Sequence, residues 1–453
     1  MMRKPKLTVQ QTVFGDRVAR NEDFEPVSLE IETPYVCPKC GHRWRGTKRT
    51  KPHVKRNLFA VEPVRVHYDY ECPKCRHEWN GTNHIAKGKN AELRRIITVA
   101  AVDRPAYRIP SMQEITASPF NGVSVASLFS GCGGSSLGYR MAGCKVVYAS
   151  EFVEAAGDTY IANFPDTFLD RRDIREVDAS EILKTANLKR GELGILDGSP
   201  PCASFSAIGD RQKNWDVVKK YSDTKQRTDD LFFEYIRILK VLRPKAFVAE
   251  NVVALSHGAA VGYFNMIVSA LRESGYDVAV KVLDAQWLGV PQMRKRLIFI
   301  GTRKDLKLTP THPRPLPYRY SIEDAIPWIS GTTTAPFDLI VEPETKLAGS
   351  VLKAWREVEL GEYSKAYMSL IRPRIENPCP TVTASIGLQA ASPTHPFEPR
   401  KFSVQELKRL CGFPDDFVLT GTFAQKCERL GRAVPPPMMK MVAETVVGIL
   451  RNL

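Results

Sequence analysis

The stretch of sequence that decides the fold is VSVASLFSGCGGSSLG, residues 123–138. Its first half (VSVASLF, 123–129) predicts a buried strand, and its glycine-rich second half predicts a turn that leads into a helix. The turn is not a complete GxGxxG motif, because Ser136 stands where the third glycine would be. A glycine turn after a first strand brings backbone N–H groups close to a ligand without specifying pyrophosphate. Many nucleotide-binding proteins share such a turn.

The same alternation of strands and helices continues beyond residue 138. Buried strands are predicted at KVVYASE (145–151), TFLDRRDI (167–174), ELGILDGSPP (192–201) and AFVAENV (246–252). Strand–helix repeats at this spacing predict an α/β fold with a doubly wound, largely parallel sheet. We therefore expect residues 121–301 to form a catalytic, cofactor-binding domain.

Two acidic residues follow the predicted strands. Glu151 ends the second strand, where a carboxylate can bridge ribose hydroxyls. Asp173 ends the third strand, where it can accept a hydrogen bond from an adenine amino group. Adenosine held without a phosphate-binding lysine suits S-adenosylmethionine better than ATP or NAD. The alternative is that these residues only cap turns, which fits each one singly better than it fits the ordered set.

A cysteine follows the fourth predicted strand, in the sequence Asp197-Gly-Ser-Pro-Pro-Cys202. A residue just past the C-terminal end of such a strand lies in the crevice where these sheets bind ligands, and the two prolines restrict the backbone before it. Cys202 is therefore a candidate nucleophile, provided that its surroundings activate the thiol. A polar, basic segment follows at residues 203–230 and is expected to be a mobile loop. The thiols of Cys132, Cys144, Cys411 and Cys427 are interpreted as buried and inert.

Charged residues recur on two later segments. The strand AFVAENV ends in Glu250-Asn-Val, and the segment GVPQMRKRLIFIG (289–301) carries Gln292, Arg294 and Arg296 on alternate residues. Alternation on an extended segment points these three side chains to one face.

These blocks, in this order, resemble the motifs of the DNA (cytosine-5)-methyltransferase family, and the resemblance covers most of residues 122–453. It implies an S-adenosylmethionine-dependent methyltransferase fold that acts on double-stranded DNA. It also implies that Cys202, Glu250 and Arg296 act on a flipped-out cytosine, with Arg294 supporting the site. The residues that it implies for the cofactor are Phe129, Gly131, Gly133, Gly134, Glu151, Phe152, Asp173, Ile174 and Pro201.

The chemistry of cytosine requires such a set of groups. C5 of cytosine is a poor nucleophile, and addition of the Cys202 thiolate at C6 makes C5 reactive toward a methyl sulfonium. Glu250 can share a proton with ring N3, and Arg296 can neutralise charge that develops on O2. The sequence names no base for the C5 proton, for which we expect water.

The remainder of the C-terminal half contains the last motifs. Residues 302–396 are proline-rich and irregular until a helix expected at VLKAWREVELG (351–361), and the resemblance assigns them to target recognition. Residues 397–453 are expected to return to the catalytic domain. Their final block has Arg432 after Gly431, where the family normally has Asn near the cofactor, and Ala203 replaces the usual Gln after the cysteine.

The basic N-terminal region, residues 1–120, contains a near-repeat. Two CPKC segments supply Cys37, Cys40, Cys72 and Cys75, which predict a structural Zn²⁺ site in a zinc ribbon at about 31–85. Four unrelated free thiols are the alternative. The module's role, in docking a nucleic acid or another partner or in structure alone, stays open.

Composition limits the other interpretations. The chain carries a net charge of +15, of which residues 1–120 contribute +9 from 22 Lys and Arg against 13 Asp and Glu, and this favours a nucleic-acid partner. No signal peptide or membrane-spanning segment is evident, so we expect a cytoplasmic protein of bacterial or phage type that is monomeric on DNA. The sequence leaves open whether a companion restriction endonuclease accompanies it.

Two other functions stay open. A cytosine methyltransferase acting on RNA is the first, although its tRNA-directed relatives usually have Thr where Ser206 stands. A DNA-binding protein without catalysis is the second, against which Cys202, Glu250 and Arg296 argue.

Overall fold

The computed structural model describes residues 104–201, 230–388 and 392–453, apart from the side chain of residue 259, and elsewhere only the backbone of short strands. By its internal contacts the chain divides into two compact units, Met1–Arg104 and Pro105–Leu453. The larger unit holds the central sheet.

This sheet has seven strands in the order β14-β15-β13-β10-β7-β8-β9. Their bounds are β7 Ser124–Leu128, β8 Lys145–Ser150, β9 Phe168–Asp170, β10 Ile195–Gly198, β13 Ala246–Asn251, β14 Tyr276–Asp284 and β15 Lys295–Arg303. The ladders from β13 through β10, β7 and β8 to β9 are parallel, whereas β15 is antiparallel to both of its neighbours. The predicted α/β fold with a largely parallel sheet is confirmed, and the reversed β15 makes the sheet mixed.

The chain changes direction across the sheet between β7 and β10. From β7 it runs outward to β8 and β9, and it then returns to β10 and β13 on the other side of β7. In doubly wound sheets the crevice outside the carboxyl ends of the strands at such a switch point binds ligands. The topology therefore predicts a site beyond the ends of β7 and β10.

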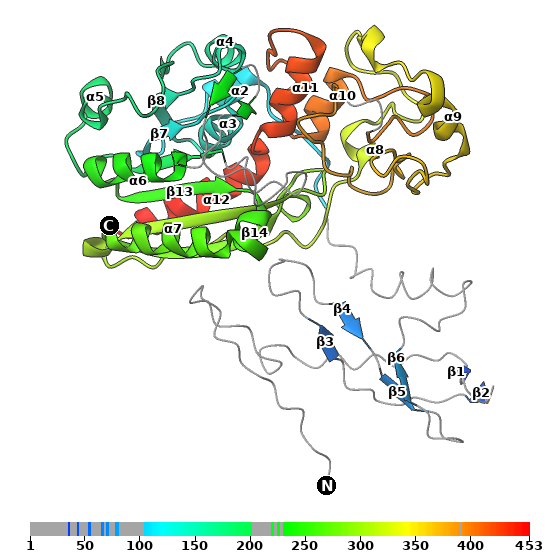
Figure 1. Ribbon diagram of the computed structural model, residues 1–453, viewed down its shortest axis with the longest axis horizontal. Helices are drawn as coiled ribbons and strands as arrows, with labels where there is room; N and C mark the ends of the chain where they lie inside the picture. Colours follow the sequence, from blue (N-terminus) through cyan, green and yellow to red (C-terminus); the bar gives the residue numbers. More distant parts are fainter. Residues whose placement is uncertain are drawn as a thin grey trace. The chain divides into compact units, whose positions relative to one another are not determined.

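Helices cover the sheet in two groups (Figure 1). Helix α3 (Gly134–Met141) packs against the C-terminal α12 (Pro436–Leu450), whereas α5 (Ala179–Thr185), α6 (Leu231–Leu242) and α7 (Val261–Glu273) contact one another in series. The α3–α12 contact is close because Gly138 has no side chain: a Cβ there would lie 2.6 Å from Cβ of Met439. The C-terminal helix is thereby held against the helix that follows the glycine turn.

The remaining helices complete the unit. They are α2 Met112–Thr116, α4 Glu154–Asn163, α8 Ile322–Ala325, α9 Gly349–Glu357, α10 Val404–Leu410, α11 Phe423–Arg432, and the 3-10 turns η3 Val253–Ser256, η4 Gly258–Ala260, η5 Ala285–Trp287, η6 Lys304–Leu306 and η7 Pro343–Thr345. Helices α8, α10 and α11 begin with capping boxes, which satisfy their first N–H groups. Within the described part of the chain, none of the helices has the length and apolar character that a membrane crossing requires.

The region around α9 has a small core of its own, formed by Leu347, Val351, Ala354, Trp355 and Leu370. Its flanks belong to the main core, since Ile322 and Phe402 share one cluster with Leu137 of α3. The α9 region is therefore continuous with the catalytic core at its two ends.

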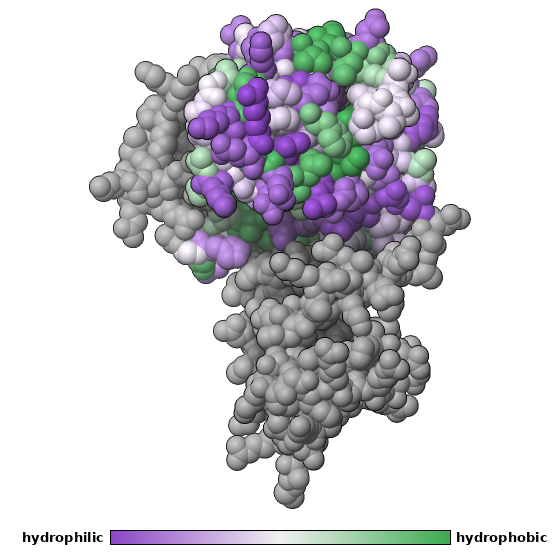
Figure 2. All heavy atoms as spheres, turned by 90° about the vertical axis from the view of Figure 1, so that its right-hand side faces the viewer, coloured by the Kyte–Doolittle hydropathy of each residue, from purple (hydrophilic) through white to green (hydrophobic). Residues whose placement is uncertain are grey.

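Figure 2 shows one face of the molecule, on which hydrophobic side chains gather in small areas among hydrophilic ones.

Several predicted features lie outside the described residues. These are Cys202, most of residues 203–230, and the proposed zinc ligands Cys37, Cys40, Cys72 and Cys75. Short antiparallel strand pairs are described nearby: β1 (Tyr35–Val36) with β2 (Arg43–Trp44), β3 (His53–Lys55) with β4 (Arg65–His67), β5 (Asp69–Glu71) with β6 (Glu78–Asn80), and β11 (Lys219–Tyr221) with β12 (Thr224–Gln226).

Candidate active site

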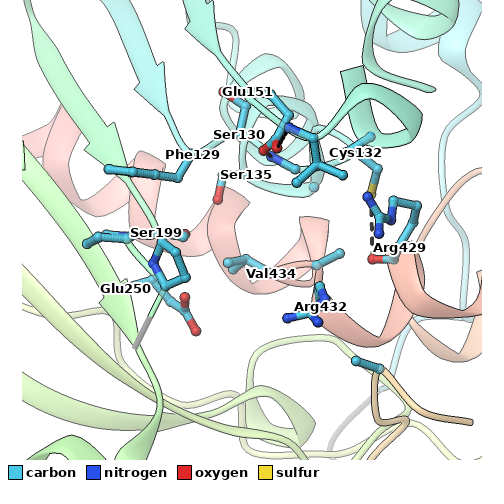
Figure 3. A pocket seen from close by; sticks show the side chains of 18 of the residues that line it. Phe129, Ser130, Cys132, Ser135, Glu151, Ser199, Glu250, Arg429, Arg432 and Val434 are labelled. Carbon is cyan, nitrogen blue, oxygen red and sulfur yellow. Dashed lines mark hydrogen bonds between the residues drawn. The ribbon is translucent and has the colours of Figure 1, made fainter. Parts of the chain in front are cut away.

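A cavity of about 540 Å³ lies beyond the carboxyl ends of β7, β8, β10 and β13. Its walls include the segments that directly follow these strands and the loop after β9. Further wall residues are Leu231, Arg294, Arg296 and, from the C-terminal part of the chain, residues 381–384, 429 and 431–434. Figure 3 shows Phe129, Glu151, Glu250 and Arg432 around this one space. The cavity occupies the switch point that the topology predicts.

The glycine turn forms one wall. Phe129, Gly131 and Gly133 have φ values of 54°, 56° and 94°, and Gly133 is the N-cap of α3. A Cβ on Gly133 would lie 2.3 Å from the ring of Phe164, so only glycine fits there. Ser136, which breaks the GxGxxG pattern, is buried and accepts a hydrogen bond of 3.0 Å from the Tyr160 hydroxyl. A packing contact therefore explains the serine.

The Glu151 carboxylate is fixed by two backbone amides. Oε2 accepts from Gly131 N at 2.7 Å, and Oε1 accepts from Val153 N at 2.8 Å. Burial raises the pKa of Glu151, while these two bonds and the charges of Arg429 and Arg432 act to lower it. Its neighbour Phe152 also lines the cavity and leaves 42% of its surface exposed. A rigid acceptor beside an exposed aromatic ring suits a nucleoside.

Asp173 reaches the cavity from a different position than predicted. We expected it to end a strand over residues 167–174, but β9 ends at Asp170. Asp170 is buried, accepts from the Tyr148 hydroxyl at 2.8 Å, and accepts from the backbone N of Arg172 at 3.0 Å, which turns the chain away from the sheet. Asp173 and Ile174 then line the cavity from the loop after β9.

A basic residue that sequence reasoning missed holds Asp173. Nη1 of Arg175 donates to Asp173 at 2.9 Å, and its Nη2 and Nε donate to the Asp230 carboxylate at 2.7 and 3.0 Å. Asp230 is the N-cap residue of α6. Arg175 thus links the loop after β9 to the start of α6. Its contact with Asp230 joins residues 55 apart in sequence, so no local pattern predicts that link.

Glu250 and Arg296 meet at the other end of the cavity. Nε of Arg296 lies 2.8 Å from Oε1 of Glu250, and both side chains are largely buried. Burial lowers the pKa of Arg296, and the Glu250 charge opposes that shift. Nδ2 of Asn251, the next residue of β13, donates a hydrogen bond of 3.1 Å to the Pro200 carbonyl. The end of β13 is therefore tied to the Pro-Pro segment that precedes Cys202.

The three alternating side chains of residues 292–296 divide between two roles. Arg294 and Arg296 line the cavity, whereas Gln292 is not among the lining residues and bonds to the Leu410 carbonyl and the Val382 amide. Arg294 is buried and donates 2.8 Å bonds to the carbonyls of Val382 and Gly431. Burial lowers its pKa to about 9, with a smaller effect from the Arg296 charge. Arg294 therefore connects two segments of the cavity wall by bonding to their backbone carbonyls.

The structure adds wall residues that sequence reasoning set aside. Thr381, Thr383 and Ala384 line the cavity, although the segment 378–385 was interpreted as mainly structural. The run of small hydroxyl side chains in PTVTAS is the feature that could have indicated this. The buried state predicted for Cys132, Cys144, Cys411 and Cys427 is confirmed, and burial raises the pKa of each thiol.

Comparison with known proteins gives a consistent result. Residues 123–448 match the family model for C-5 cytosine-specific DNA methylase. The chain is 30% identical over 335 residues to the type II methyltransferase M1.HphI of Haemophilus parahaemolyticus, covering 72% of this chain and 87% of that protein. It is 31% identical over 363 residues to M.FnuDI of Fusobacterium nucleatum, another type II methyltransferase, covering 73% and 96%.

Solved structures resemble the fold. A protein encoded within an Escherichia coli prophage and assigned as a DNA modification methyltransferase gives a TM-score of 0.59 at 23% identity, over 73% of this chain and 99% of that one. A DNMT2 protein of Spodoptera frugiperda gives 0.53 at 18% identity, over 72% and 99%. At these identities the likeness shows the fold alone.

Proposed function

The chain belongs to the C-5 cytosine-specific DNA methylase family, and from this premise we propose how its cavity performs the reaction. The protein is a DNA cytosine-5 methyltransferase that uses S-adenosylmethionine. The observation that carries the proposal is one continuous cavity, lined by Glu151 and Asp173 as well as by the Glu250–Arg296 pair. A donor and an acceptor can therefore meet in it.

The residues on the Glu151 side fit the adenosine of the cofactor. The Glu151 carboxylate, held by two amides, would accept from the ribose hydroxyls, and Asp173 from the adenine amino group. The exposed ring of Phe152 offers a surface on which adenine can stack. Gly131 and Gly134 would approach the cofactor with their backbone, whereas Gly133 does not line the cavity and shapes the turn against Phe164. Phe129, Ile174 and Pro201 complete the wall. When bound, the cofactor supplies a methyl group on a sulfonium.

On the other side, Glu250 and Arg296 would hold a cytosine flipped out of the duplex. Glu250 would share a proton with ring N3, and Arg296 would face O2. The Cys202 thiolate would form a bond to C6, and C5 would then take the methyl group as its bond to the sulfonium sulfur breaks and S-adenosylhomocysteine leaves. Loss of the C5 proton to water would leave the C5–H electrons as the C5–C6 double bond, and the electrons of the C6–S bond would return to sulfur and free Cys202. Pro201, at the cavity wall, is the residue before this cysteine.

A transfer assay separates DNA methylation from its two alternatives. We expect labelled methyl groups from S-adenosylmethionine to appear on duplex DNA, and none to appear with Cys202→Ala. Cys144→Ala, which removes a buried thiol that does not line the cavity, is the matched control and should keep the activity. Label on tRNA alone would support the RNA function, and absence of label on both would support a non-catalytic DNA-binding protein.

Residues 302–396 are proposed to choose the DNA sequence. Two observations support this proposal: the region has a small core of its own around α9, and it carries exposed side chains such as Met368, which is 92% exposed. Sequencing of methylated DNA after expression would identify the recognised word. The type II designation of the relatives supports a companion restriction endonuclease, and we propose that the enzyme acts as a monomer.

A structural Zn²⁺ is proposed for the N-terminal unit. In the sequence, each CPKC segment stands between two short strands that pair antiparallel, β1 with β2 for the first and β5 with β6 for the second. This order of strand, CxxC and strand is the one expected of a metal-binding knuckle. The test is the zinc content of purified protein. We expect it to fall in a Cys37→Ser/Cys72→Ser variant and to persist in Cys144→Ser; unchanged zinc in the double variant would contradict the site.

A further inference from the structure

Basic side chains gather at the end of the central sheet opposite to the cavity. The segments before β10 and β13 lie at that end, and so does the segment after β15, because β15 runs antiparallel to β13. These three segments, residues 189–192, 243–245 and 303–307, hold seven basic residues against two acidic ones, and we call them the basic loops. The chain beyond residue 120 carries +6 of the net charge of +15, and the basic loops contribute +5 of it.

Hydrogen bonds hold the basic loops side by side. Nη1 of Arg303 donates to the carbonyls of Gly191 at 3.2 Å and Arg243 at 2.6 Å, so the third loop contacts the first two. Nε of Arg190 donates to the Val241 carbonyl at 3.0 Å, just before the second loop. The basic loops therefore form one surface with a defined arrangement of charges.

Two cations of the basic loops stand at backbone positions that favour glycine. Arg243 is the C-cap of α6 with a φ of 48°, and Lys307 is the C-cap of η6 with a φ of 53°. Among the described residues, the other non-glycine residues with positive φ are Phe129 and Asn187. A side chain in this left-handed region costs stability relative to glycine. A cation at a helix end can offset part of that cost, but Lys240 already supplies this interaction from the last turn of α6.

The charges of these two residues are available to a partner. Arg303 pairs with Asp305 at 2.7 Å, whereas in the described part of the chain no ion pair is found for Arg243 or Lys307. Lys307 is exposed and Arg243 is partly exposed. Cations spread over three loops suit a polymer with regularly spaced phosphates better than a small anion.

The basic loops and the cavity lie at opposite ends of the same strands. Arg296, at the cavity, and Arg303, in the basic loops, stand near the two ends of β15. This strand has nine residues, which span about 30 Å. Double-stranded DNA is stiff over about 150 base pairs, so a short duplex at the cavity cannot bend round to the basic loops. DNA at the basic loops is therefore a separate segment.

We propose that the basic loops bind the phosphates of a second segment of double-stranded DNA while the cavity holds the first. The choice of DNA rests on the proposed function, because DNA is the polyanion on which the enzyme acts. Contacts to phosphates carry no base sequence, so this second segment can have any sequence. One protein molecule would then bridge two DNA molecules.

The test is a bridging assay with the full-length protein and no cofactor. A long duplex is fixed to beads, protein is added and washed, and capture of a short fluorescent duplex of unrelated sequence is measured. We expect wild type to capture it, with a steep fall as salt rises. Arg243→Gly/Lys307→Gly should weaken the capture by about tenfold to a hundredfold and reduce the logarithmic salt slope by about two. Arg243→Lys/Lys307→Arg keeps both charges and should capture as wild type does.

Asn187→Gly is the matched control, because it replaces another left-handed residue by glycine without changing the charge. It should bridge as wild type does. Urea unfolding should show the double glycine variant to be at least as stable as wild type, because glycine relieves the left-handed backbone. A less stable double variant would mean that the two cations serve the fold, and it overturns the inference.

Other outcomes also decide the matter. Absence of bridging by wild type, or bridging that the double glycine variant retains in full, overturns the inference. Loss of binding to vesicles of phosphatidylserine and phosphatidylcholine, with bridging unchanged, overturns it in favour of a membrane surface. Methyl transfer to DNA by the double variant should stay at the wild-type rate, since neither residue lines the cavity. Failure of wild type to methylate DNA overturns the proposed function, which the bridging assay does not measure.

Discussion

Arg296 Nε lies 2.8 Å from Glu250 Oε1, although the two residues belong to antiparallel strands, β15 and β13. Their side chains are 16% and 10% exposed. Each charge therefore offsets much of the cost of burying the other, and the pair can exist before a base enters. An entering cytosine therefore meets a carboxylate and a cation that are already in position.

Replacing Glu250 by Gln should stop most of the chemistry without removing the cofactor. Gln cannot exchange a proton with ring N3, so we expect the single-turnover rate of methyl transfer to fall by about 10²–10⁴-fold. Binding of S-adenosylhomocysteine, measured by calorimetry, should stay within a few-fold, because Glu151 and Asp173 lie on a different part of the wall. Glu154→Gln, an exposed acid on α4, is the control. A wild-type rate for Glu250→Gln would remove Glu250 from the mechanism.

Arg294→Lys should lower stability more than it lowers cofactor affinity. The guanidinium bonds two carbonyls, those of Val382 and Gly431, and one ammonium cannot match both directions. We expect unfolding in urea to show a loss of about 2–4 kcal/mol. Arg451→Lys, at the exposed C-terminus, should change nothing measurable. If both variants unfold at the same urea concentration, the two carbonyl bonds do not stabilise the fold.

The sequence correctly predicted those parts of the site whose structure is determined by residues close to them in the chain. The strand, turn and helix of residues 123–138 follow from apolar pattern and glycine, and they appear where predicted. The meeting of Glu250 and Arg296 was implied by family resemblance and not by any local pattern, because its register is set across the sheet. Arg294 was expected to support the site, but its partners lie 88 and 137 residues away in sequence.

Element ends were missed where distant side chains decide them. A helix was predicted over residues 351–361, but α9 spans Gly349–Glu357. The next carbonyl, that of Val358, accepts a 2.9 Å bond from Arg372, and the same guanidinium lies 4.2 Å from the ring centre of Trp355. The bond from Arg372 satisfies the Val358 carbonyl from outside the helix, and α9 ends at the residue before it. Nothing in the segment itself indicates it.

Gly133→Ala should destabilise the fold and weaken cofactor binding together. The residue has a φ of 94°, and a Cβ would lie 2.3 Å from the Phe164 ring. Strain and overpacking predict a loss of about 2–4 kcal/mol in chemical unfolding. Gly448→Ala in α12 is a matched control, since its Cβ would meet nothing within 4 Å, and it should be neutral or slightly stabilising. Equal stability of the two variants would contradict the close packing of the turn.

Asp197 should make stability fall as pH rises. It is buried beneath the cavity end of β10 and accepts from Ser127 Oγ at 2.8 Å and from the Tyr139 hydroxyl at 3.2 Å. Burial raises the pKa of Asp197 to about 7, and these two bonds only partly oppose the shift. The unfolded chain releases this proton near pH 4, so between about pH 4 and 7 the native state binds more protons than the unfolded state.

The stability contributed by protonated Asp197 is therefore complete below about pH 4 and is lost as pH rises through about 7. Asp197→Asn stays neutral, so its unfolding free energy should exceed that of wild type at pH 8 by a few kcal/mol, and this difference should shrink as pH falls and disappear near pH 4. Urea unfolding at several pH values measures the difference, with Asp158→Asn, an exposed carboxyl paired with Arg171, as the control. Parallel pH profiles for Asp197→Asn and wild type would mean that Asp197 is ionised throughout, and that its two hydrogen bonds outweigh its burial.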